Sequence, residues 1–170
     1  MTTLIVIDMQ NDFVTGVLGS EEAVEILPNV KQRIETHIKN GNRVIFTRDT
    51  HGDNYLDTNE GKHLPVSHCI KNTYGWEIVK GIDHPECEHI DKPTFGYKDW
   101  ESVIKDCNQI EIIGVCTDIC VICNALILKT YYPDIEITVN AHCCAGLTPE
   151  RHKAAIEVLK SCQINVLGGY

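Results

Sequence analysis

The stretch Gln109-Ile-Glu-Ile-Ile-Gly-Val-Cys-Thr-Asp-Ile-Cys120 changes its hydrophobic period halfway along. Its first half is a continuous apolar run rich in β-branched residues, which is typical of a strand buried on both faces. Apolar residues then recur every three or four positions as far as Lys129, which predicts a helix that Thr117 or Asp118 can cap. Cys120 is therefore expected in the first turn of a helix that begins where a buried strand ends.

This position favours chemical reactivity in Cys120. The first amides of a helix lack partners, and the positive end of the helix dipole favours an anion. We therefore expect a lowered thiol pKa and a nucleophilic thiolate at Cys120. Most buried cysteines are inert, and Cys123, one turn further on among apolar residues, is interpreted as a packing residue.

Strand and helix patterns alternate along the rest of the chain. Besides the run before Cys120, five segments predict strands: Thr3 to Ile7, Arg43 to Thr47, His89 to Lys92, Ile135 to Val139 and Ile164 to Leu167. Helical patterns separate them, including Val24 to Ile38, Asp99 to Lys105 and Pro149 to Ser161. This alternation predicts one α/β domain over residues 1–170, with three α-β-α layers and a mostly parallel sheet.

The composition of the chain indicates which binding partners and which cellular compartment to expect. The formal net charge of −9 comes without a basic stripe, so neither nucleic acid nor an anionic membrane is an expected partner. No apolar run approaches the roughly 18 residues of a membrane span, and no secretory signal pattern is expected at the N-terminus. The nine cysteines are an odd number, which disfavours a disulfide framework and favours a cytoplasmic protein.

A long polar segment between His51 and about Glu88 carries a candidate metal site. Asp49 and His51 stand two residues apart just past a predicted strand, so both can turn toward one ion. His68 can supply a third ligand and Glu60 a fourth, and such mixed carboxylate–imidazole sets suit zinc, iron or manganese. A solvated loop that happens to carry histidines is the alternative interpretation.

Five motifs, in this order, resemble those of the isochorismatase-like cysteine hydrolases, and the metal-site pattern resembles the nicotinamidase branch. They are Asp8-Met-Gln-Asn-Asp-Phe13, Thr47-Arg-Asp-Thr-His51, Leu64-Pro-Val-Ser-His-Cys69, Lys92, and Gly114-Val-Cys-Thr-Asp-Ile-Cys120. The resemblance implies a six-stranded parallel sheet in the order 3-2-1-4-5-6, with helices on both faces. It also implies a homo-oligomer, a dimer or a tetramer.

Carried over to matching positions, the resemblance implies roles for individual residues. The implied catalytic residues are Asp8, Lys92 and Cys120, and the implied metal ligands are Asp49, His51 and His68, with Glu60 as a fourth. The resemblance also implies a cis peptide before Cys116, with the amides of Cys116 and Cys120 forming an oxyanion hole. Phe13 matches the aromatic wall of the substrate pocket, whereas Leu64 replaces a residue that is often aromatic.

The implied activity is hydrolysis of a small amide, with nicotinamide giving nicotinate and ammonia through a thioester. The implied cofactor is a divalent metal, zinc first, with iron or manganese as alternatives, that orients the pyridine nitrogen. Trp76, Tyr97 and Trp100 are candidates to complete the aromatic wall, and Asn140, where the family often has Asp, is interpreted as structural. The alternatives are a metal-free hydrolase of a carbamoyl or ureido compound, and a non-catalytic thiol switch or binding protein.

Overall fold

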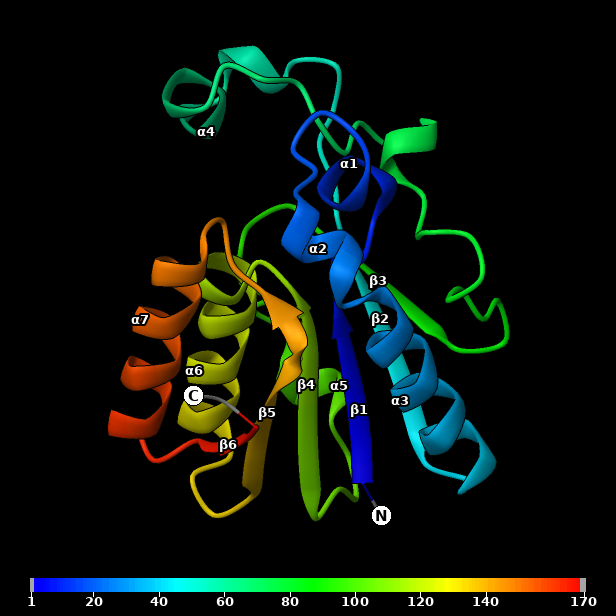
Figure 1. Cartoon of the computed structure of the whole chain (residues 1–170), viewed down its shortest axis with the longest axis vertical. Helices are drawn as coiled ribbons and strands as arrows, with labels where there is room; N and C mark the ends of the chain where they lie inside the picture. Colours follow the sequence, from blue (N-terminus) through cyan, green and yellow to red (C-terminus); the bar gives the residue numbers. More distant parts are fainter. Residues whose placement is uncertain (1, 169–170) are drawn as a thin grey trace.

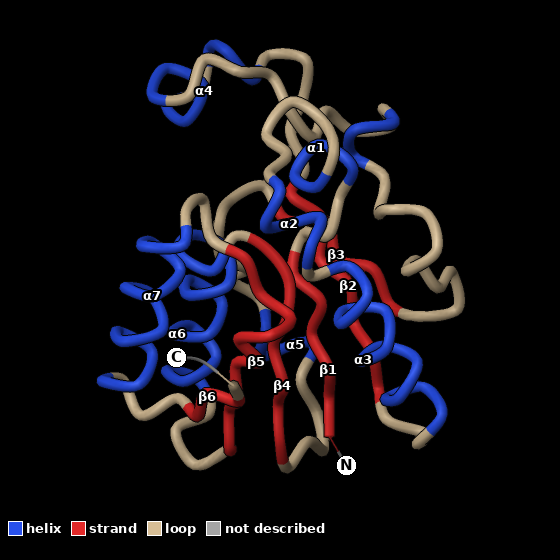
Figure 2. The backbone as a smooth tube through the Cα atoms, viewed as in Figure 1, coloured by secondary structure: helices blue, strands red, loops and turns tan. Residues whose placement is uncertain are grey.

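A computed structural model describes residues 2–168 of the chain, and its centre is one six-stranded sheet (Figures 1 and 2). All strands pair in parallel, in the order β3-β2-β1-β4-β5-β6. Their bounds are β1 Thr2–Ile7, β2 Arg43–Asp49, β3 Glu88–Lys92, β4 Gln109–Val115, β5 Glu136–Ala145 and β6 Asn165–Leu167. The predicted α/β fold and strand order are confirmed.

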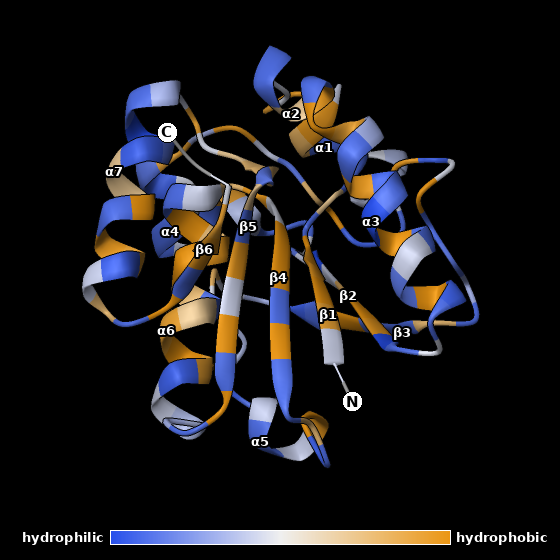
Figure 3. Cartoon of the chain, turned by 60° about the horizontal axis from the view of Figure 1, so that its bottom comes forward, coloured by the Kyte–Doolittle hydropathy of each residue, from blue (hydrophilic) through white to orange (hydrophobic). Residues whose placement is uncertain are grey.

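Two hydrophobic cores, one on each face of the sheet, join it to helices. The α-helices are α1 Asn11–Val14, α2 Glu21–Glu25, α3 Leu27–Lys39, α4 Asn59–His63, α5 Trp100–Val103, α6 Ile122–Tyr131 and α7 Pro149–Ser161. One core contains buried residues of α2 and α3, and the other contains residues of α5, α6 and α7. In Figure 3, α3 and α7 carry alternating hydrophobic and hydrophilic patches, as expected for helices that cover a sheet. Within residues 2–168, no helix combines the length and the hydropathy that crossing a bilayer requires.

Several predicted boundaries were wrong. The pattern from Val24 to Ile38 forms two helices, because Pro28 has no N–H for a continuous helical hydrogen bond at this point and instead lies in the first turn of α3, which begins at Leu27. The helix predicted from Asp99 to Lys105 is the single turn α5, and β5 runs six residues beyond Val139 to Ala145. The polar segment after β2 contains α4 and two short 3-10 turns, Tyr55–Asp57 and Tyr74–Trp76.

The strand order reverses between β1 and β4, and this point defines the functional edge of the sheet. Ligands of open parallel sheets bind at the carboxyl ends of the strands beside such a switch point. Asp8 follows β1 directly with φ +48°, and Ile7 pairs with Gly114 of β4. A Cβ at Gly114 would lie 2.1 Å from the Ile7 carbonyl oxygen, so only glycine permits this close approach of the two strands.

Candidate active site and metal site

Three predicted catalytic side chains meet in the buried space above β1, β3 and β4. Lys92 Nζ lies 2.6 Å from Asp8 Oδ2 and 3.6 Å from Cys120 Sγ. Asp8 and Lys92 have no solvent-exposed surface, and Cys120 is 4% exposed. Thr47 donates a 2.6 Å hydrogen bond to the other Asp8 oxygen, so both oxygens of this carboxylate are held. The arrangement places an acid–base group and a cation beside a thiol.

Burial and mutual charge set the protonation states of this cluster. Burial raises the pKa of Asp8, Lys92 opposes this rise, and the negative charge of Asp49 adds to it. Burial alone would lower the pKa of Lys92, but the Asp8, Cys120 and Asp49 charges raise it above its usual range. The ammonium of Lys92 therefore stays charged, and it forms a buried ion pair with Asp8.

The predicted lowering of the Cys120 pKa was wrong for this state of the protein. Burial raises the pKa of the thiol well above its usual range, and the Asp8 charge and hydrogen bond add to the rise, while Lys92 opposes it. These influences favour the neutral thiol, with its proton directed at Asp8. Asp8 is already in place to accept this proton.

Cys120 nevertheless lies at the predicted junction of strand and helix. It belongs to Thr117–Val121, a π-helical turn that leads into α6, and the preceding Val115–Cys116 peptide is cis, as the resemblance implied. The predicted side-chain cap was wrong, because no side chain caps this turn. Asp118 accepts a hydrogen bond from the Leu147 amide instead, at 3.0 Å.

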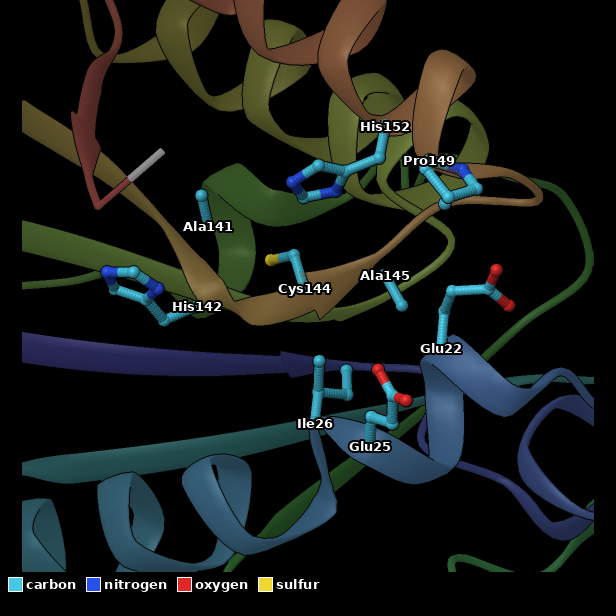
Figure 4. A pocket seen from close by; sticks show the side chains of 10 residues that line it. Glu22, Glu25, Ile26, Ala141, His142, Cys144, Ala145, Pro149 and His152 are labelled. Carbon is cyan, nitrogen blue, oxygen red and sulfur yellow. The ribbon is translucent and has the colours of Figure 1, made fainter. Parts of the chain in front are cut away.

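His152 supports the same turn from behind, and sequence reasoning missed it. Its Nδ1 shares a 2.8 Å hydrogen bond with Thr117 Oγ1, and both residues are buried. Figure 4 shows His152 reaching from α7 over Cys144 into a cavity of about 200 Å³ that is separate from the candidate site. This cavity is bordered by α2, β5 and α7, and none of the residues predicted for the site lines it.

The predicted metal ligands converge on one point beside the cluster. Asp49, His51, Glu60 and His68 each offer a ligand atom, and these four atoms lie within 4.8 Å of one another. Asp49 Oδ2 is 2.9 Å from His51 Nε2 and 3.5 Å from His68 Nε2. Glu60 Oε1 is 3.7 Å and 3.9 Å from the same two nitrogens. Glu60 therefore lies within reach of the same ion as the other three residues.

The chemistry of this donor set fits a divalent cation. Two imidazoles and two carboxylates match the ligands that zinc, iron and manganese take. His68 donates from Nδ1 to the Val66 carbonyl at 2.8 Å, which directs its Nε2 toward the other ligands. Although burial opposes it, His51, His68 and Lys92 hold the pKa of Asp49 well below its usual range, so this carboxylate is ionised.

Gln10 holds the metal-site end of β2 in position, and sequence reasoning did not assign it a role. Its side chain accepts from the Asp49 amide at 2.7 Å and donates to the Asp49 carbonyl at 2.8 Å and to the Trp76 carbonyl at 2.9 Å. Gln10 lies inside the first motif quoted for the family resemblance. Its place there was the signal that could have identified it.

An apolar cavity of about 300 Å³ connects the thiol with the metal-binding side chains. Besides Asp49, Glu60, His68 and Cys120, it is lined by Phe13, Leu18, His63, Leu64, Phe95, Cys116, Ile119 and Leu147. The predicted wall residues Phe13 and Leu64 are present. The second aromatic ring comes from Phe95, which was missed, whereas Trp76, Tyr97 and Trp100 do not line the cavity.

The fold is a three-layer α-β-α arrangement around a parallel sheet, with the candidate site at the switch point of the strand order. The model of the isochorismatase domain matches residues 2–168, and the chain belongs to this family. The family resemblance found in the sequence is therefore confirmed.

Several individual relatives belong to the nicotinamidase branch of the family. The chain is 27% identical to a nicotinamidase of Schizosaccharomyces pombe, over 96% of this chain and 91% of that one. It is 31% identical to a probable inactive nicotinamidase of Arabidopsis thaliana, over 94% and 88%. A pyrazinamidase of Pyrococcus horikoshii, crystallised in complex with zinc, has a TM-score of 0.88 and 29% identity, covering 99% of both chains. Together with the family match, the relatives named as nicotinamidase and pyrazinamidase, other than the probable inactive one, confirm the prediction of an amidohydrolase that acts on a carbon–nitrogen bond other than a peptide bond.

Proposed function

We propose that this protein is a metal-containing, cysteine-dependent amidohydrolase that converts nicotinamide to nicotinate and ammonia. One observation carries the proposal: Cys120, which lies beside Asp8 and Lys92, lines the same apolar cavity as Asp49, Glu60 and His68 of the metal site. A flat heteroaryl amide in this cavity can contact the thiol and the metal site at once. The apolar walls between them suit an aromatic ring.

Acylation begins with the neutral thiol of Cys120. As Sγ bonds to the amide carbon, Asp8 takes the thiol proton, and the carbonyl oxygen becomes an oxyanion that the amides of Cys116 and Cys120 hold. Asp8 then gives the proton to the leaving nitrogen, the carbon–nitrogen bond breaks, and ammonia departs. A thioester between Cys120 and the acyl group remains.

Deacylation uses the same acid–base group. Asp8 accepts a proton from a water molecule whose oxygen attacks the thioester, and it returns that proton to the Cys120 sulfur as the acid leaves. Lys92 stays charged throughout and stabilises the negative charge that moves between Asp8, the sulfur and the oxyanion.

Asp49, His51, Glu60 and His68 would hold the metal, for which zinc is the first candidate and iron and manganese are alternatives. A bound divalent ion supplies an electrophilic contact for the ring nitrogen, directly or through water, and so orients the substrate.

The test is ammonia release from nicotinamide by zinc-loaded protein, beside a Cys120→Ala variant. We expect turnover in the wild type and none above background in the variant, with equal zinc content in both. Because one relative is described as probably inactive, turnover has to be measured directly. Release that persists in Cys120→Ala would refute the cysteine mechanism.

If the zinc-loaded wild type releases no ammonia from nicotinamide, nicotinamide is not the substrate. Carbamoyl and ureido compounds are then the next substrates to test. Labelling of Cys120 by iodoacetamide without turnover of any amide would favour the thiol-switch alternative.

We further propose that the protein is cytoplasmic, assembles as a dimer or tetramer, and binds neither nucleic acid nor membrane. The acidic net charge of −9 and the absence of a basic stripe in the sequence support this view of its partners. Light scattering after size exclusion measures the mass of the assembly, and a monomer at micromolar concentration would contradict it.

A further inference from the structure

Asn124 is a fully buried residue of α6. Its side chain joins the turn Thr117–Val121, which contains Cys120, to the loop after Lys92. Its Nδ2 donates to the Cys120 carbonyl at 2.8 Å and to the Phe95 carbonyl at 3.0 Å. Its Oδ1 accepts from the Tyr97 amide at 2.9 Å and from Trp100 Nε1 at 3.0 Å. The amide thus uses two donor and two acceptor positions, its full capacity.

The loop that Asn124 holds carries two parts of the proposed active site. Thr94 accepts a 3.2 Å hydrogen bond from Lys92 Nζ through its carbonyl, and the Phe95 ring lines the substrate cavity although 43% of it is exposed. Gly96 lies so close to α6 that a Cβ there would stand 2.4 Å from Ile127 Cδ1. The loop is therefore pressed against the helix that begins beside Cys120.

We propose that Asn124 is a positioning residue that fixes the distance between the Cys120 nucleophile and the Phe95 wall and, through Thr94, the placement of Lys92. This inference rests on the proposed amidohydrolase function. Both hydrogens of a single NH₂ group bind the carbonyls of Cys120 and Phe95, so neither residue can shift without breaking a buried hydrogen bond. A displacement of about 1 Å at a reacting atom can cost about 100-fold in rate.

The chemistry of the contacts requires an amide at this position. A hydroxyl offers one donor and cannot reach four partners, and a carboxylate would face the two carbonyl oxygens without a donor. Tyr97 and Trp100, predicted as wall residues, instead supply the two donors that orient Asn124 Oδ1, and in this way they hold Phe95 at the cavity indirectly.

The test compares Asn124→Leu, which keeps the volume but removes all four hydrogen bonds, with Asn140→Leu. Asn140 is a similarly buried asparagine, but it hydrogen-bonds Glu111 on β4, away from the site. We expect both variants to lower the melting temperature. Only Asn124→Leu should lower kcat for nicotinamide by about 10-fold or more and also raise KM, because the nucleophile and the wall both move.

A purely structural role predicts a different result. If folded Asn124→Leu matched Asn140→Leu in kcat and KM within about twofold, the proposal would be overturned. If Asn124→Leu does not fold, Trp100→Phe removes one of the two hydrogen bonds to Oδ1, together with part of a buried ring, and leaves Asn124 itself in place. A smaller fall in kcat then supports the proposal, and unchanged kinetics in this folded variant overturn it.

A second readout separates this inference from the proposed substrate. The rate of Cys120 alkylation by iodoacetamide, followed by peptide mapping, reports the environment of the thiol whether or not nicotinamide is turned over. We expect Asn124→Leu to change this rate, and to increase hydrogen exchange in residues 93–97, while Asn140→Leu changes neither. If wild type releases no ammonia but these differences appear, the substrate is wrong and the positioning role stands; if neither difference appears, the positioning role is wrong.

Discussion

Replacing Lys92 with Met should make protein stability depend on pH in a way that identifies Asp8 as its buried partner. In the wild type, burial and Asp49 raise the pKa of Asp8, and Lys92 holds it down. The Lys92→Met variant keeps the raising influences and loses the larger of the two opposing ones, while the hydrogen bond from Thr47 remains. The pKa of Asp8 therefore rises further, and near neutral pH this group has to take up a proton to remain buried.

The size of the effect follows from this proton uptake. Protonating a folded carboxyl costs about 1.4 kcal/mol for each pH unit above its unfolded pKa of about 3.9. At about pH 7 this gives about 4 kcal/mol, within the ~3–5 kcal/mol usual for removing one partner of a buried ion pair. Because the folded pKa of Asp8 is raised, stability is lost as pH rises from the unfolded toward the folded value. The variant is thus least impaired at acidic pH.

Urea unfolding of zinc-loaded wild type and Lys92→Met between about pH 5 and pH 8 measures the difference in stability. We expect this difference to grow by up to about 1.4 kcal/mol per pH unit, and to lose its pH dependence when Asp8→Asn is added. Turnover of Lys92→Met should fall about 10² to 10⁴-fold, since a protonated Asp8 cannot accept the thiol proton. A stability difference that is independent of pH would refute the reasoning.

Three further changes test other parts of the molecule. Asp49→Asn should abolish stoichiometric zinc binding, whereas Glu60→Gln should weaken it and leave a detectable site; equal zinc content in both variants, measured after dialysis, would contradict this. Asn140→Asp should cost about 1–3 kcal/mol at neutral pH in urea unfolding, because a second carboxylate replaces the donor to buried Glu111; an unchanged midpoint would contradict it. Leu64→Phe should lower KM for nicotinamide by about 3- to 10-fold by adding a ring to the wall, and an unchanged KM would show that Leu64 does not face the substrate.

The fold was predictable because its signals are local. The buried strands are short apolar runs, α7 was predicted with the bounds Pro149–Ser161 that it has, and alternation of the two patterns gives the parallel sheet. The errors lie where one residue or tertiary packing overrides the pattern. Pro28 divides one helix in two, and β5 extends to Ala145 because neighbouring β4 continues to pair with it past an irregularity in register.

The candidate site was predictable only as far as its motifs reach. Asp49 and Lys92 end β2 and β3, and Asp8 directly follows β1, so their convergence follows from the topology of a parallel sheet once the strand order is known. Phe95 and Asn124 could not be found this way. Their roles depend on the path of an irregular loop and on hydrogen bonds between segments about 30 residues apart, for which sequence periodicity carries no signal.

The pKa of the Cys120 thiol was predicted wrongly for an electrostatic reason. A nearby lysine favours a thiolate, but burial and the neighbouring Asp8 carboxylate both have a larger effect on the pKa of the thiol, and they raise it. The outcome suits the proposed chemistry, because an oxidation-prone thiolate is not maintained while the cavity lacks substrate. Charge then develops on the sulfur only as Asp8 receives its proton. Lys92, 2.6 Å from one group and 3.6 Å from the other, stabilises the negative charge on whichever of them carries it.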